Sequence, residues 1–305
     1  MLVTLTGASG FIGSYTAKAL ADAGHEVRAL VRNTSRRDHI EDFVTEFAVG
    51  THDDPAVAHE LVRGADAIIH NSVDWHPLRK EDINAHFRSN LLGTLTLLEA
   101  ARQAGCSQFV FVSSVATHHE IVTTPTIVET HPLWPGNLYG AYKAAIEPNL
   151  KAYHTKYGMN TSAWRPAAVY GVDPNLDRSQ WRGLIQRAAA GEPIETDRGG
   201  KITHVQDVAD ALTCAIGDDQ TAGQVYNLVD QYLYWQRVAE LAKEIAGSDA
   251  EITDRTGTGP ANQFDTAKAE AFFDRHGKPT ALRRGEAGVR AYVAELLEAL
   301  STSAV

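Results

Sequence analysis

The stretch Thr6-Gly7-Ala8-Ser9-Gly10-Phe11-Ile12-Gly13 lies between an apolar run at residues 2–5 and a helical pattern at residues 14–23. Its first glycine allows a tight turn, its second lets a phosphate approach the backbone, and its third lets helix and strand pack closely. The N–H groups at the helix start then face the phosphates, aided by the helix dipole. We therefore predict a strand–turn–helix unit that binds a dinucleotide through Gly7, Ser9, Gly10, Phe11, Ile12 and Gly13.

Outward from this turn, the first half of the chain alternates short apolar runs with longer helical patterns. Strands are expected at 2–5, 27–31, 47–49, 67–69 and 109–112, and helices at 14–23 and 90–104. Gly24 and Gly105 follow the two helices, where glycine commonly ends one. Such alternation implies parallel strands joined by helical crossovers. The pattern predicts an α/β fold with a doubly wound (Rossmann) parallel sheet.

The second half is less regular. Helices are expected at 139–157, 234–246 and 286–300, and strands at 162–164 and 225–228. Pro148 lacks an N–H and should interrupt or kink the first of these helices. We predict a nucleotide-binding domain over residues 1–170, to which 201–230 return. Residues 171–200 and 231–305 then form a smaller C-terminal substrate-binding lobe.

Composition indicates a folded globular protein, since 44% of the 305 residues are hydrophobic and 22% are charged. The net charge of -10 argues against binding nucleic acid or anionic membranes, so an anionic ligand needs local donors. The two cysteines suggest reduced thiols, and no run approaches the ~20 apolar residues of a membrane span. With no basic leader at the N-terminus, we expect a cytoplasmic enzyme with a small-molecule substrate.

The end of the second predicted strand bears on the choice of cofactor. An acidic residue there would bind the ribose hydroxyls of NAD, whereas an arginine accommodates the 2′-phosphate of NADP. This chain has Arg32 there, with Arg36 and Arg37 close behind and no acidic residue until Asp38. A solvated basic loop is the alternative. Because the planar guanidinium suits phosphate, we favour NADP(H) over NAD(H), bound by Arg32 and Arg36.

Tyr139 and Lys143 stand four residues apart, on one face of the predicted helix. An ammonium nearby would stabilise the phenolate and lower the pKa of the tyrosine, which can then exchange a proton with an alcohol or carbonyl. Tyr142 directly precedes the lysine, so spacing selects Tyr139. Ser113 and Ser114 follow the strand at 109–112, and a serine there can donate to a developing alkoxide. The alternative for Tyr139 and Lys143 is a solvated helix face. The alternative for the serines is that they hydrogen-bond to backbone groups at the end of the strand.

Together these residues resemble the extended short-chain dehydrogenases/reductases, the NAD-dependent epimerase/dehydratase-like family, from Met1 to about Tyr292. The resemblance is closer to the dihydroflavonol-reductase and hydroxysteroid-dehydrogenase branches. The segments that carry it, in family order, are TGASGFIG at 6–13, FVSS at 111–114, YGAYK at 139–143, RPAAVYG at 165–171 and HVQDVADA at 204–211.

The resemblance implies roles for particular residues. Ser114, Tyr139 and Lys143 would be catalytic, with Ser113 in support, and His204 and Asp207 structural. The remaining cofactor contacts implied are His70, Asn71 and Ser72 after the fourth strand, and Pro166 and Val169 beside the nicotinamide. Family members often dimerise through the helix that bears the lysine, so a homodimer is possible. Where the family often has Gly-Asp-Leu near the adenine, this chain has Gly50-Thr51-His52-Asp53.

Other side chains have candidate roles that the motifs do not fix. Candidates for walls of the substrate pocket are Trp75, His76, Trp134, Trp181 and the histidines His118, His119 and His131. Aromatic packing is the commoner role of such tryptophans. We find no carboxylate and histidine spacing that suggests a metal site.

Three functions compete within this resemblance. The first is NADP(H)-dependent hydride transfer to or from a carbonyl or secondary alcohol of a small or medium substrate. The second is a nucleotide-sugar epimerase or dehydratase with tightly held NAD. Two features argue against this second function. Related sugar enzymes commonly bind the diphosphate through an asparagine and an arginine, where this chain has Ala168 and Gly200. Dehydratases have acidic residues where this chain has Val115 and Ala116. The third is a nucleotide-sensing regulator without catalysis, against which the retained Ser114, Tyr139 and Lys143 argue. We expect the first.

Overall fold

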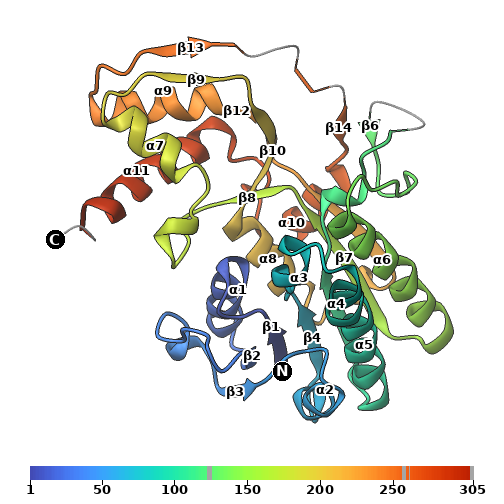
Figure 1. Cartoon of the computed structure of the whole chain (residues 1–305). Helices are drawn as coiled ribbons and strands as arrows, with labels where there is room; N and C mark the ends of the chain where they lie inside the picture. The colour runs from blue at the N-terminus through green and yellow to red at the C-terminus, as the bar shows by residue number, and fades with distance from the viewer. Residues whose placement is uncertain (122–125, 256–258, 261, 303–305) are drawn as a thin grey trace.

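The computed structural model describes residues 1–121, 126–255, 259–260 and 262–302 (Figure 1). Its largest element is a seven-stranded sheet in the order β11-β7-β5-β4-β1-β2-β3, and every neighbouring pair is parallel. The strands are β1 (Leu2–Thr6), β2 (Glu26–Val31), β3 (Glu46–Val49), β4 (Ala67–His70), β5 (Gln108–Val112), β7 (Asn160–Pro166) and β11 (Gln224–Leu228). The chain fills one half of the sheet outward from β1 and then the other outward from β4. This order confirms the predicted doubly wound sheet.

Helices cover both faces of this sheet. One face carries α1 (Phe11–Asp22), α8 (Val205–Ala215) and α10 (Ala267–Arg275), and the other α2 (Pro55–Val62), α5 (Gly93–Gln103) and α6 (Leu138–Tyr157). Successive strand side chains point to opposite faces. Thus Ile69 and Val110 join the apolar cluster of the first face, and their neighbours Ile68 and Phe109 join that of the second. Burial on both faces explains why these strands are continuous apolar runs in the sequence.

A smaller part lies beyond the carboxyl ends of β5 and β7 (Figure 1). It contains a sheet of β8 (Ala168–Tyr170), β10 (Gly199–His204) and β12 (Gln231–Tyr234), and a strand pair of β9 (Ile194–Thr196) and β13 (Ile252–Asp254). Its helices are α7 (Arg182–Ala189), α9 (Trp235–Ala246) and α11 (Gly285–Thr302). These elements share an apolar cluster of their own, which includes the buried Tyr170, Trp181 and Tyr292. A last strand pair joins β6 (Thr126–Ile127) to β14 (Gln263–Phe264).

Three local expectations need revision. The helix expected from residue 90 begins instead as a π-helical segment, Phe87–Leu92, which joins the short helix α4 (Ile83–His86) to α5. A separate short helix, α3 (Trp75–Arg79), precedes α4. The strands β8, β10 and β12 were not expected. The helix does not break at Pro148, because α6 runs through it. Ile146 and Leu150, on either side, are buried against the sheet and hold both halves in place.

The His204–Asp207 signature has the structural role expected of it. His204 is the N-cap of α8, and its Nδ1 accepts from the N–H of Gln206 at 3.1 Å. The buried Asp207 accepts from the Arg284 guanidinium at 2.7 Å and from the Leu282 N–H at 3.1 Å. These contacts tie α8 to the segment that leads into α11. No helix in the described ranges is long and apolar enough to cross a membrane.

Candidate active site

A cavity of about 790 Å³ lies along the carboxyl ends of the strands, at the point between β1 and β4 where the strand order reverses. Open α/β sheets bind ligands at this switch point. Most of the residues expected to bind the cofactor or act in catalysis line it, namely Gly7, Ser9, Gly10, Phe11, Ile12, Arg32, Arg36, Asn71, Ser72, Ser113, Ser114, Tyr139, Lys143, Pro166 and Val169.

The glycine turn fits the pyrophosphate of a dinucleotide. Gly7 has a positive φ of 71°, and a Cβ there would lie 3.1 Å from the backbone of Ser72. Gly10 is the N-cap of α1 and offers no side-chain cap, so the first N–H groups of this helix are left for a ligand. Gly13 does not line the cavity, because it packs against the turn: a Cβ there would lie 2.0 Å from the Gly7 carbonyl oxygen. It therefore serves close packing and not direct contact.

His70 does not line the cavity, although the family resemblance implied that it would. Its ring is fully buried, with Nδ1 2.8 Å from Thr6 Oγ1 and Nε2 2.9 Å from Thr94 Oγ1. Burial lowers its pKa well below the usual value, which keeps the ring neutral. The same Thr6 hydroxyl accepts from the N–H groups of Asn71 and Ser72 at 3.0 and 3.1 Å. His70 thus supports the two residues after it, which do reach the cavity.

The basic loop after β2 presents three arginines in different states. The exposed Arg32 side chain lines the cavity and makes no hydrogen bond or ion pair with the rest of the described chain. Arg36 also lines it but binds Asp38 at 2.7 and 3.3 Å. Arg37 lies over the Phe47 ring, 5.4 Å from its centre. Of the three, Arg32 is the one whose guanidinium is available to a phosphate.

The catalytic candidates meet on the first turns of α6 and the end of β5. The Asn137 side chain caps α6 by accepting from the Gly140 N–H at 2.8 Å, which fixes the start of the helix. Tyr139 and Lys143 then share one face, with Lys143 Nζ 5.7 Å from the centre of the Tyr139 ring. The Ser114 side chain is hydrogen bonded to the Tyr139 phenol. This places a phenol, a hydroxyl and an amine around one end of the cavity.

The charges in this group differ from the sequence-based expectation. Burial raises the pKa of Tyr139, and only the hydrogen bond from Ser114 opposes this. Lys143 Nζ donates instead to the Val112 carbonyl at 2.5 Å, and burial lowers its pKa to about 7, against the attraction of Glu147. The pKa of Tyr139 is therefore raised by burial and not lowered, contrary to the expectation. A phenol that keeps its proton is suited to donate it to a carbonyl oxygen.

Tyr142, the competing tyrosine, belongs to the core. Its side chain is buried, its hydroxyl lies 3.1 Å from Thr94 Oγ1, and burial raises its pKa. It does not line the cavity, which supports the choice of Tyr139 by spacing.

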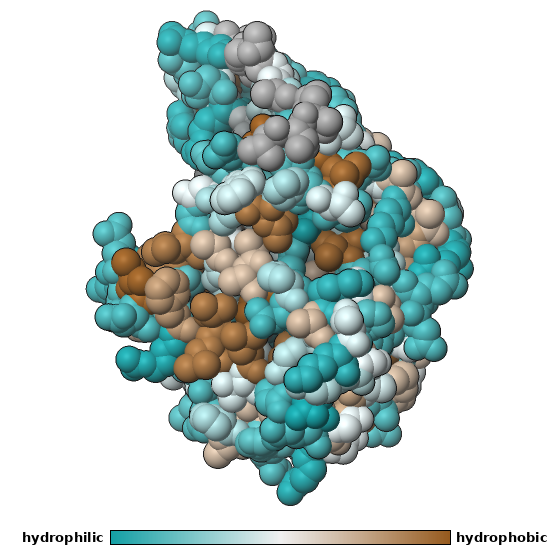
Figure 2. Space-filling view, turned by 90° about the vertical axis from the view of Figure 1, so that its right-hand side faces the viewer, coloured by the Kyte–Doolittle hydropathy of each residue, from teal (hydrophilic) through white to brown (hydrophobic). Residues whose placement is uncertain are grey.

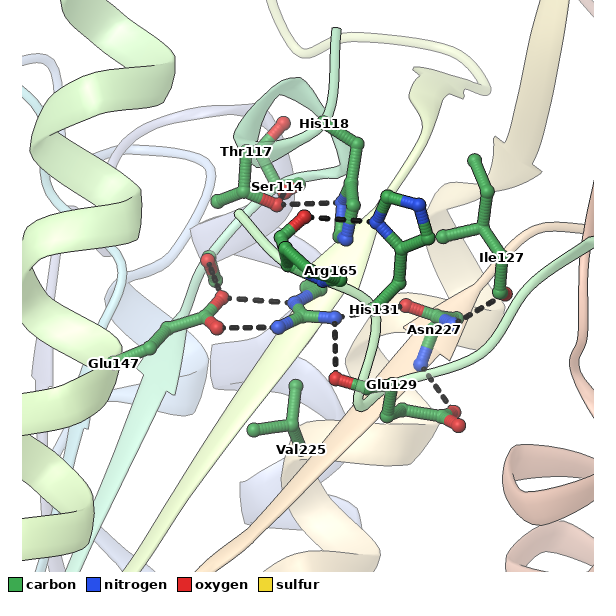
Figure 3. A network of polar contacts seen from close by, with 12 residues as sticks. Ser114, Thr117, His118, Ile127, Glu129, His131, Glu147, Arg165, Val225 and Asn227 are labelled. Carbon is green, nitrogen blue, oxygen red and sulfur yellow. Dashed lines mark hydrogen bonds and ion pairs between the residues drawn. The ribbon is translucent and has the colours of Figure 1, made fainter. Parts of the chain in front are cut away.

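A buried polar network backs the two serines (Figure 3). Ser113 Oγ donates to Glu147 at 2.6 Å, and the same carboxylate receives two bonds from Arg165, at 2.6 and 2.9 Å. Arg165 also donates to the Glu129 carbonyl at 3.3 Å and to Asn227 at 3.5 Å. Glu147 is one helical turn from Lys143, so the network joins β5, β7, β11 and α6 directly behind the reactive group.

Among the aromatic candidates, Trp75 lies at the site. Its ring stacks on Tyr139 with centres 4.9 Å apart, and 45% of the residue is exposed. Trp181 is instead in the core of the smaller part, and His118 and His131 do not line the cavity. The sequence reasoning missed the lining residues His39, Asp173, Asn175 and Arg178. It noted the stretch at 50–53 near the adenine but assigned no contact to Thr51, His52 or Asp53, which also line the cavity. Among these residues, only Asp53 offered a sequence signal, because it is an acidic residue three positions after Gly50, close to where the family often has an aspartate near the adenine.

Comparisons with known proteins agree with this geometry. The model of the NAD dependent epimerase/dehydratase family matches residues 3–228. A putative dihydroflavonol 4-reductase from Synechocystis sp. is 28% identical over 215 residues, 67% of this chain and 60% of that protein. A UDP-glucose 4-epimerase from Lacticaseibacillus casei is 32% identical over 278 residues, 83% of this chain and 84% of that protein. The crystal structure of a UDP-glucose 4-epimerase from Thermotoga maritima superposes with a TM-score of 0.79 at 21% identity, covering 98% and 100% of the two chains.

Proposed function

This chain belongs to the NAD dependent epimerase/dehydratase family, the extended short-chain dehydrogenases/reductases, and we propose that within it the protein is an NADP(H)-dependent oxidoreductase. Its substrate is a small or medium organic molecule with a carbonyl or secondary alcohol. The relatives above are named as both reductases and epimerases, so the choice depends on the site itself.

The residues around the cavity have complementary tasks in a carbonyl reduction. When bound, the nicotinamide dinucleotide supplies the hydride that reaches the carbonyl carbon. Tyr139 gives its proton to the carbonyl oxygen as that oxygen gains negative charge, and Ser114 donates a hydrogen bond to the same atom. Lys143, held at the Val112 carbonyl with Nζ 5.7 Å from the centre of the Tyr139 ring, places positive charge near the phenolate that Tyr139 becomes. The reverse sequence oxidises an alcohol.

The observation that carries the proposal concerns the described residues of the smaller part. The two positions where related sugar enzymes bind the diphosphate of the substrate have no donor side chain here. Ala168 begins β8 and Gly200 lies on the paired β10, where a Cβ would meet nothing within 4 Å. Space for a donor side chain is therefore present at Gly200, but the donor is not. Without donor side chains for the diphosphate, a nucleotide-sugar would bind poorly to a chain of net charge -10.

Four cations of the smaller part, Arg182, Arg187, Arg198 and Lys201, do not replace the missing donors, because each is engaged. Arg178, whose side chain has no partner among the described residues, lines the cavity together with the glycine turn. Arg182 pairs with Asp177 at 3.3 Å and Arg187 with Glu192 at 2.8 Å. The Arg198 guanidinium lies 3.9 Å from the centre of the Trp235 ring, and Lys201 donates to Asn262 at 2.8 Å. A sugar diphosphate would have to displace these contacts.

Calorimetry with UDP-glucose on the NADP-loaded protein tests this proposal. We expect binding in the millimolar range or weaker, roughly -4 kcal/mol or less favourable. A micromolar dissociation constant for a nucleotide-sugar would replace the reductase by an epimerase. A titration of Gly200→Arg, which introduces a donor where space exists, is the matched comparison and should bind UDP-glucose more tightly than the wild type.

We further propose a homodimer and a cytoplasmic location. Figure 2 shows a broad apolar patch on the side of the molecule that carries α4, α5 and α6. Large apolar side chains of these helices and the π-helical segment are 40–58% exposed, namely Ile83, Phe87, Leu92 and Leu138. A second copy would cover such a patch. Light scattering that gives one chain per particle would contradict the dimer.

A further inference from the structure

A segment of the smaller part reaches back over the nucleotide cavity. Asp173, Asn175 and Arg178 line the cavity together with Ser9 and Phe11 of the glycine turn. The segment comes after β8, so it belongs to the chain that leaves the large sheet. The two walls of the cavity therefore come from different parts of the molecule.

Local hydrogen bonds give this segment a defined shape. The N–H of Asp173 donates to Ser179 Oγ at 3.1 Å, the N–H of Asn175 to Asp173 Oδ1 at 2.8 Å, and the N–H of Arg178 to the Asn175 carbonyl at 2.8 Å. The Tyr15 hydroxyl on α1 donates to the Val172 carbonyl at 3.0 Å. The segment is thus fastened to the helix whose first turn faces the pyrophosphate.

Charge singles out Arg178 within the segment. Its side chain is exposed and makes no hydrogen bond or ion pair with the described residues, whereas Arg182, four residues on, pairs with Asp177. The neighbouring Asp173 is buried, and burial raises its pKa, while Arg178 and His39 act on it in the opposite direction. His39 Nε2 in turn lies 3.2 Å from the Ser9 carbonyl oxygen. Arg178 is therefore an available cation that lines the same cavity as the glycine turn.

We propose that Arg178 binds the pyrophosphate of the dinucleotide from the side opposite the glycine turn. An anion in this acidic chain needs local cations, and the glycine turn itself contributes only backbone N–H groups. A guanidinium supplies two parallel charge-assisted bonds to such an anion. Cofactor binding then fastens the smaller part to the sheet. The inference rests on the dinucleotide binding of the proposed function but not on the preference for NADP.

Arg178→Gln tests the inference by calorimetric titration with NADPH and with NADH, which share the pyrophosphate. Both dissociation constants should rise about tenfold to a hundredfold, the range for a lost charge-assisted contact. Arg182→Gln removes the same charge four residues away and should leave both constants unchanged. Thermal unfolding of both ligand-free variants checks that the fold is kept.

Two results would overturn the inference while leaving the proposed function intact. One is unchanged affinity of Arg178→Gln for both dinucleotides. The other is a loss confined to NADPH, which would assign Arg178 to the 2′-phosphate. A wild type that binds neither dinucleotide would instead remove the proposed function and the inference together.

Discussion

Tyr139 is the residue on which the proposed chemistry depends most. Its phenol is hydrogen bonded to Ser114 and keeps its proton at neutral pH, because burial raises its pKa. Tyr139→Phe should lower turnover by roughly 10²–10⁴-fold and leave cofactor affinity nearly intact. Tyr142→Phe, which changes a buried hydroxyl bonded to Thr94, should be far milder in steady-state assays. If Tyr139→Phe keeps more than about a tenth of wild-type turnover, another group is the acid, since that loss is below the range for proton transfer.

Lys143 should determine the alkaline side of the pH profile. Burial lowers its pKa to about 7, so the ammonium is lost as the pH rises through about 7. Reduction needs that charge near the developing phenolate, and kcat/KM, which reports the free enzyme, should therefore fall above about pH 7. Lys143→Arg stays charged at all these values, so in that variant the decline should move to higher pH. A decline at the same pH in both proteins would assign it to another group.

Arg32 is the residue that should set cofactor preference. Its guanidinium lines the cavity without a partner among the described residues. A charge-assisted contact with phosphate is worth about 1.5–3 kcal/mol, so Arg32→Ala should weaken NADPH about tenfold to a hundredfold while NADH barely changes. Arg37→Ala, which removes a guanidinium stacked on Phe47, is the control in the same titrations. Equal losses for both dinucleotides would show that Arg32 has a structural role.

Among the elements, α6 and β7 are joined by the buried ion pair of Glu147 and Arg165, whose side chains are 4% and 2% exposed. Arg165→Met would leave the Glu147 carboxylate buried without its partner, and should lower the free energy of unfolding by about 3–5 kcal/mol. The double variant Glu147→Leu/Arg165→Met removes both charges and should recover most of this loss in denaturant titrations. A double variant as unstable as the single one would contradict this explanation.

The elements that sequence predicts are those with strong local signals. The strands of the large sheet are apolar because both faces are buried, and Gly24 marks the end of α1. Helix α2 was overlooked although Asp54 caps it and Pro55 starts it, which is a recognisable signal. Strands such as β8 and β9 have three residues each and pair with distant segments, so no local pattern reveals them.

At the scale of the whole molecule, the residues of the site fall into two groups. One group comes from compact sequence motifs, and the other is brought to the cavity by packing between segments far apart in the sequence. The glycine turn, Ser114, Tyr139 and Lys143 belong to compact motifs, and the sequence predicts them together. Arg178 and Asp173 reach the cavity only because the smaller part packs against α1, a contact between segments far apart in the sequence. The bond of Lys143 to the Val112 carbonyl is likewise set by burial and not by spacing.

Net NADPH-dependent reduction by this protein is tested most directly by one measurement. The protein is mixed with NADPH and a panel of aldehydes and ketones, and NADPH absorbance and alcohol product are followed together. We expect one alcohol formed for each NADPH oxidised with at least one carbonyl compound, and both changes should be roughly 10²–10⁴-fold slower with Tyr139→Phe. No NADPH oxidation across the panel, together with interconversion of UDP-glucose by the same protein without net loss of cofactor, would contradict the account and make the protein an epimerase.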